Sequence, residues 1–240
     1  TMGGFDQMTA RVGGFWDAML AEGRRWWITA NSDSHIHYTQ GGIDFWPGEY
    51  SKTYVHAIKE HADILDGIRH GRVFVTTGDL VSELYVTVAQ GSSQAAIGGE
   101  LTVRGGEVVE VVIRLKDPGN ANAAGRFPTV ARVDLIVGQV TGPGKDAHRD
   151  EHSFVRVVAR FTPDDWQKDG SYIEMRHSLK LDKPSYLRVR GTNVAAQLEP
   201  EPDELGEDPW SDLWFYSNPV FVRPVLHIGK RPAKELKPTS

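Results

Sequence analysis

Two hydrophobic patterns divide the chain, one before and one after Gly78. Before it, apolar residues first recur at helical spacing, as Met8, Val12 and Phe15 do, and short apolar runs stand between such stretches. The expected elements are helix 7–24, strand 25–30, strand 52–57, helix 61–72 and strand 73–78. Helices and strands that alternate in this way predict an α/β layer or barrel.

After Gly78 the pattern changes to β-branched, often alternating runs that glycine, proline, aspartate and asparagine turns separate. Seven runs fit strands: 80–90, 106–116, 131–140, 153–161, 170–179, 184–193 and 219–225. Short strands in such a series predict an antiparallel Ig-like β-sandwich. We therefore expect an α+β protein in three parts, with an α/β segment at 1–79, a β-sandwich at 80–226 and a tail at 227–240.

Composition and charge exclude several classes of function. The 240 residues carry a net charge of −5 and no cysteine, and 40% of them are hydrophobic. The charge gives no basic surface for nucleic acid, and the lack of cysteine excludes disulfides and thiolate zinc sites. No apolar run reaches the roughly 18 residues of a membrane span. None of this fixes the compartment, so a cytoplasmic and an exported protein both stay open.

The stretch ITANSDSHIHY places Asp33, His35 and His37 directly after an expected strand. Residues two apart on an extended chain point to the same side, and strand ends are where sheets and barrels of α/β proteins carry their sites. A carboxylate beside an imidazole suits Zn²⁺, Mn²⁺ or Fe²⁺. The alternative is that Asp33 caps a turn and His35 is an ordinary loop residue. His37 could be a ligand, a partner of a ligand, or a surface residue.

A catalytic metal site needs about three protein ligands, and Asp33 with His35 supplies two. Further acidic and histidine residues stand nearby in the sequence, at Asp44, Glu49, His56 and His61. Their spacing does not select any of them. The chain therefore has too few ligands for an enzyme that works by itself.

Several segments in order resemble the closing section of a PHP domain, the polymerase-and-histidinol-phosphatase family of metal-dependent phosphoesterases. They are WDAMLAEGRRWWITANSDSH, WPGEYSKTYV and ILDGIRHGRVFVTTG, and further along the chain YLRVRGTN and WFYSNPVFV. The resemblance covers about residues 15 to 80, with the last two segments similar to the β-rich tail of longer members. It implies the C-terminal βα segment of a (β/α) barrel, followed by the β-sandwich.

The resemblance implies that Asp33 and His35 bind divalent metal ions that activate water against a phosphorylated small-molecule substrate. The family's remaining ligands precede this region, so the expected partner of the chain is the N-terminal remainder of a PHP domain. The loop after His35 would then cover the substrate pocket with Trp46 and Tyr50. Its basic residues would meet the phosphate, namely Lys52 and either Arg24 or Arg25. The alternative for this loop is packing against the sandwich.

A second function class competes with the enzyme. The β-sandwich could be a non-catalytic binding or interaction module, with the first part of the chain as an α/β adaptor. Exposed aromatic side chains such as Trp210 or Trp214 would then stack on carbohydrate, although tryptophans are more often core residues.

Overall fold

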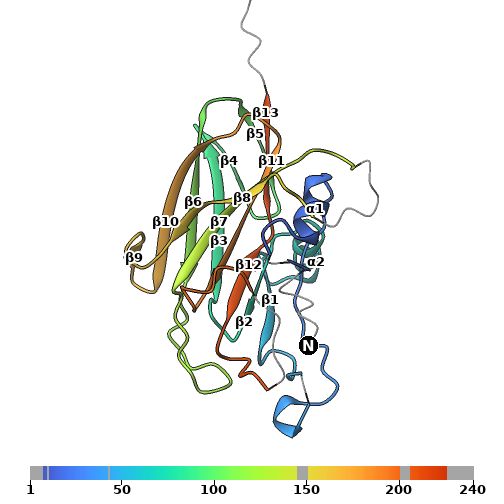
Figure 1. The fold of residues 1–240 in the computed structure, drawn as a ribbon, viewed down its shortest axis with the longest axis vertical. Helices are drawn as coiled ribbons and strands as arrows, with labels where there is room; N and C mark the ends of the chain where they lie inside the picture. Colours follow the sequence, from blue (N-terminus) through green and yellow to red (C-terminus); the bar gives the residue numbers. More distant parts are fainter. Residues whose placement is uncertain (1–7, 10, 43, 145–150, 201–205, 226–240) are drawn as a thin grey trace, which may run out of the picture.

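The computed structural model describes residues 8, 9, 11–42, 44–144, 151–200 and 206–225. Within these residues the strands form two sheets, and the helices lie beside one of them (Figure 1). The tail expected at 227–240 lies outside the described residues. No helix in the described part of the chain is long and apolar enough to cross a bilayer.

The larger sheet has eight strands in the order β1-β2-β12-β11-β13-β5, and β7 joins it by pairing with both β11 and β8. Its strands are β1 (Ser51–Val55), β2 (Val73–Thr77), β5 (Glu100–Arg104), β7 (Arg132–Gln139), β8 (Val155–Phe161), β11 (Ser185–Thr192), β12 (Trp214–Ser217) and β13 (Val220–Val225). The smaller sheet runs β4-β3-β6-β10-β9. Its strands are β3 (Glu83–Gln90), β4 (Ser93–Ala96), β6 (Val108–Lys116), β9 (Gln167–Asp169) and β10 (Tyr172–Lys180).

The main core lies between the two sheets, and burial that alternates along strands of the smaller sheet such as β6 contributes one side of it. On β6, Val111, Ile113 and Leu115 are buried, while the residues between them are more exposed. Leucine and valine side chains of β7 and β11 join the same cluster from the larger sheet. Burying each such side chain contributes about 1.5 to 3 kcal/mol, so this shared apolar layer holds the sheets together.

The larger sheet also buries its other face. The helix α1 (Phe15–Ala21) places Trp16 and Leu20 against Tyr186 of β11 and Phe221 of β13. Every residue of β11 is buried, because the strand has the apolar core on one side and α1 with its neighbouring segments on the other. The sequence of this strand still alternates, with Leu187 and Val189 in the core between the sheets and Tyr186 and Arg188 on the face toward α1.

The expectation of a C-terminal βα segment of a (β/α) barrel is wrong. Barrel strands are parallel neighbours joined by helical crossovers, whereas β1 pairs antiparallel with β2, and β2 pairs antiparallel with β12. The helix α2 (His61–Arg69) connects β1 to β2 within this antiparallel arrangement. Residues 25–30 belong to no strand ladder of the described structure. The fold is β-sandwich-like and mostly antiparallel, and β1 and β2 extend the larger sheet.

Candidate functional site

An extended segment leads into the loop that carries the expected site. Side chains hold this segment in place, since the amide of Ile28 donates to Asn218 Oδ1 at 2.9 Å. The amide of Ala30 donates to Thr53 Oγ1 at 2.8 Å, and the Thr53 hydroxyl donates back to the Ala30 carbonyl at 2.6 Å. The segment is therefore fixed beside β1 without belonging to the sheet.

The His35 ring contacts the backbone of Asp33 at the start of the loop. Nδ1 of His35 lies 2.7 Å from the carbonyl oxygen of Asp33. Because a carbonyl only accepts, Nδ1 carries the proton, and Nε2 holds the lone pair of the neutral ring. The His35 side chain is 80% exposed, so this lone pair is available to a ligand.

Backbone geometry at Asp33 is constrained. Its φ angle is 46°, in the left-handed region that side chains other than those of asparagine and aspartate rarely adopt. The carboxylate of Asp44 helps to hold the turn, because it accepts hydrogen bonds from the amides of His35 and Ile36, the latter at 3.1 Å. Asp44 therefore orients the segment that carries His35.

His37 lies inside the loop and uses both ring nitrogens. Nε2 lies 2.7 Å from Glu49 Oε2, and Nδ1 lies 2.6 Å from Thr39 Oγ1. The ring stacks on Trp46 with centroids 5.1 Å apart. The hydrogen bond from His37 is the main reason why the pKa of Glu49 lies below its ordinary value, with burial opposing it. In this arrangement His37 stabilises the loop and offers no free nitrogen to a metal.

The expected substrate-pocket residues mostly make contacts within the protein. The Tyr50 hydroxyl donates to the Pro209 carbonyl at 2.6 Å, and the Tyr50 ring meets Trp210 edge to face. Lys52 forms an ion pair with Asp79. Among the expected pocket residues, the Trp46 side chain, 47% exposed, is the one with a large open surface.

The two arginines expected near a phosphate are also engaged. Arg24 pairs with Glu22 at 2.7 Å, and Arg25 pairs with Glu100. The Arg25 guanidinium also lies 3.6 Å from the centroid of the Phe221 ring. Both side chains therefore already have protein partners near the segment that leads to Asp33.

Of the other ligand candidates, Asp44 lies against His35, with Oδ2 3.8 Å from Nδ1, whereas the two remaining histidines have other surroundings. His56 packs against Phe74 and Tyr85, and His61 begins α2. No group of three or more histidine, aspartate and glutamate side chains that could hold a metal ion occurs in the described ranges. The described part of the loop offers Asp33 and His35 as a pair of potential ligands.

The two tryptophans of the carbohydrate alternative have little free surface. Trp214 is 1% exposed and stacks parallel to Tyr216 in the larger sheet. Trp210 packs against both Tyr50 and Phe45. These contacts give both side chains structural roles.

A comparison of the chain with protein-family models, with curated proteins and with solved structures finds no match.

Proposed function

We propose that the chain contributes Asp33 and His35 to a divalent-metal site of a phosphoesterase. The observation that carries the proposal is the hydrogen bond from His35 Nδ1 to the Asp33 carbonyl. Metal-binding histidines commonly donate their second ring nitrogen to a carbonyl or carboxylate, which fixes the tautomer and the ring orientation. At His35 the hydrogen bond to the Asp33 carbonyl provides this support within the chain itself.

The chemistry of the pair fits a metal ion of intermediate hardness. The Asp33 carboxylate has no hydrogen bond or ion pair to any described residue, so it is free to supply an anionic oxygen. With the neutral Nε2 of His35 it offers the mixed donors that Zn²⁺, Mn²⁺ and Fe²⁺ accept. Such an ion lowers the pKa of a bound water and polarises a phosphoryl oxygen.

The order of motifs supports the choice of reaction. The segments around Asp33 and His35 resemble the closing section of PHP phosphoesterases, and the proposal takes a phosphorylated small molecule as substrate on that basis. Two ligands hold a metal weakly, so the proposal also assigns further ligands to the N-terminal remainder of a PHP domain. Trp46 contributes an exposed aromatic surface within the loop.

Titration with Mn²⁺, followed by the loss of the free-ion electron paramagnetic resonance signal, tests the proposal on the chain itself. We expect detectable binding that Asp33→Asn and His35→Gln each abolish. His70→Gln is a matched control, because His70 is also exposed and also places Nδ1 near a backbone carbonyl, at 3.0 Å from that of Asp66. Binding should survive in this control.

Equal Mn²⁺ binding by the three variants and the unmodified chain would contradict the proposal. So would unchanged hydrolysis of p-nitrophenyl phosphate when Asp33→Asn is made in the complete protein. Either result would favour the other function class, a β-sandwich interaction module with the first part of the chain as its adaptor.

A further inference from the structure

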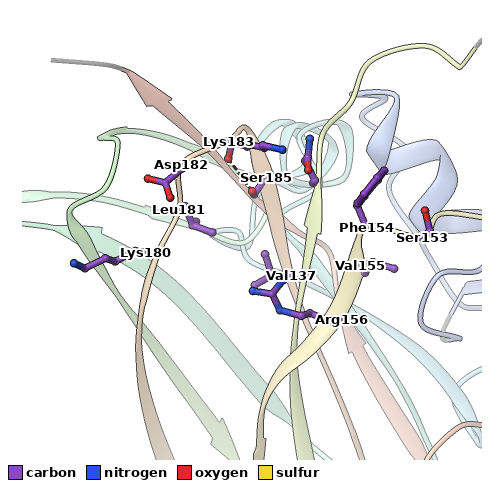
Figure 2. Close-up of a pocket in the computed structure, with 11 residues that line it drawn as sticks. Val137, Ser153, Phe154, Val155, Arg156, Lys180, Leu181, Asp182, Lys183 and Ser185 are labelled. Carbon is purple, nitrogen blue, oxygen red and sulfur yellow. Dashed lines mark hydrogen bonds between the residues drawn. The ribbon is translucent and has the colours of Figure 1, made fainter. Parts of the chain in front are cut away.

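A second site lies at the end of the sandwich where β7 and β10 end and β8 and β11 begin. An open cleft of about 400 Å³ occupies this position. Figure 2 shows Arg156 and Val137 on the side of β7 and β8, and Lys180, Leu181 and Lys183 on the side of the turn between β10 and β11. The loop with Asp33 and His35 is at the opposite end of the molecule (Figure 1), so the cleft is independent of the proposed metal site.

The cleft concentrates positive charge on a protein whose net charge is −5. Its lining includes Arg156, Lys180 and Lys183 against one carboxylate, that of Asp182. The three cationic side chains make no ion pair or hydrogen bond with the residues that the structure describes. By contrast, Arg160 on the same strand as Arg156 is bound to the Asp134 carboxylate at 2.8 Å. Cationic side chains that line a cleft without counter-ions indicate an anion-binding site.

Apolar surface accompanies the charge. Val137 and Leu181 are buried side chains that line the cleft, and Phe154, 61% exposed, lines it on the side of β8 (Figure 2). A large aromatic ring left open at a charged cleft is typical of binding sites, which combine apolar walls with a few polar groups.

We propose that this cleft binds an organic phosphate monoester, with the phosphate near Arg156 and the lysines and an apolar or aromatic group against Phe154 and Leu181. Three cations and one carboxylate give the cleft a charge of about +2, which matches the −1.5 to −2 of a phosphate monoester at neutral pH. The planar guanidinium of Arg156 can donate two hydrogen bonds to one phosphate, and the lysines add point charges. The cleft volume lies within the roughly 300 to 1,000 Å³ of small-molecule sites.

Calorimetric titration with phenyl phosphate at low ionic strength tests the site, with inorganic phosphate and phenol as the two halves of the probe. We expect one saturable site for phenyl phosphate that binds either half more weakly. Arg156→Gln and Lys183→Gln should each weaken phenyl phosphate binding by roughly tenfold or more, the effect of about one lost charge-assisted contact. Lys168→Gln is the control, because this exposed lysine of β9 lies outside the cleft.

A second pair of variants separates the apolar contribution. Phe154→Ala should weaken phenyl phosphate and leave inorganic phosphate unchanged, whereas Phe127→Ala removes a ring that is 70% exposed elsewhere and should change neither. The proposal is overturned if phenyl phosphate does not saturate one site, or if Arg156→Gln binds it as the Lys168→Gln control does. Equally tight binding of benzoate would also overturn it, since a monoanion would then suffice.

Discussion

Arg188 of β11 holds the carboxylate of Asp17 on α1 with two hydrogen bonds. Nε lies 2.8 Å from Oδ1 and Nη2 lies 2.7 Å from Oδ2, and both side chains are fully buried. The Tyr186 hydroxyl donates to the same Oδ1 at 2.9 Å. Burial, followed by the charge of Asp17, raises the pKa of Tyr186, so the hydroxyl stays protonated as a donor. This network ties α1 to the outer face of the larger sheet.

Removing one partner of this pair should destabilise the protein strongly. Asp17→Asn leaves the Arg188 charge buried without its counter-ion, and breaking a buried ion pair in this way costs about 3 to 5 kcal/mol. Urea unfolding followed by circular dichroism measures the free energy of unfolding. Arg176→Met is the control, because Arg176 is 59% exposed and binds Glu110 and Glu174 at the surface. An Asp17→Asn protein as stable as this control would contradict the structural role of the pair.

His56 should make the stability depend on pH. Its ring packs against Phe74 and Tyr85, and its Nε2 is buried without a hydrogen-bond partner among the described residues. Burial is the main cause that lowers its pKa below 6.5. The folded protein therefore favours the neutral ring. This contribution is complete above about pH 6.5 and is lost as the pH falls from there through the lower pKa of the folded state.

Substitution of His56 tests this dependence. His56→Phe should flatten the fall in the free energy of unfolding as the pH drops below about 6.5. Urea unfolding of both proteins across this range measures it. His61→Phe serves as the control, because His61 is exposed at the start of α2 and should leave the pH dependence in place. Identical pH profiles for His56→Phe and the unmodified protein would exclude His56 as the cause.

Asp44 should position His35 without binding the metal itself. Its carboxylate accepts the amides of His35 and Ile36, so Asp44→Ala releases the turn that aims the ring. We expect Mn²⁺ affinity to fall about tenfold, as it does when support for a metal ligand is removed. Asp44→Asn retains one acceptor oxygen and should recover much of the affinity. If Asn and Ala at this position behave alike while the protein stays folded, Asp44 does not act by holding these amides.

Gly191 on β11 should not accept a side chain. A Cβ there would lie 2.3 Å from the Phe215 ring and 2.8 Å from the carbonyl oxygen of Arg132. Gly191→Ala should therefore cost about 1 to 3 kcal/mol of stability through overpacking. Gly105→Ala is the comparison, because its nearest contact would be an ordinary 3.6 Å to Pro224. Thermal unfolding should separate the two variants clearly, and similar midpoints would argue against the close approach at β11.

The sequence predicted strands where burial alternates but could not predict how they pair. Residues 106–116 and 131–140 were expected as strands, and β6 and β7 lie within them. The short strands β4, β5, β9 and β12 were missed because three to five residues show too little periodicity. The barrel expectation failed because an alternation of helix and strand carries no information on strand direction. That direction is set by a distant partner, since β2 pairs with β12.

Prediction of the candidate site was limited in the same way, because a residue's surroundings depend on partners elsewhere in the sequence. The spacing of Asp33 and His35 assumed an extended chain, whereas Asp33 has a left-handed φ of 46° and the His35 ring contacts its backbone carbonyl. His37 continues that spacing, yet its environment depends on Glu49, twelve residues away. The cleft at Arg156 had no sequence signal, because its two sides come from separate turns of the sandwich.

The pairing of β2 with β12 also means that β2 is synthesised long before its partner strand. Thr76 and Trp214 are 138 residues apart in the chain, yet they lie in adjacent strands. At roughly 5 to 20 residues per second, a ribosome needs about 7 seconds or more to make the intervening segment. Throughout that interval the edge of β2 that pairs with β12 is without its partner strand. The nascent protein therefore depends on cellular factors that protect exposed strand edges. A protein with mainly local contacts would depend on them less.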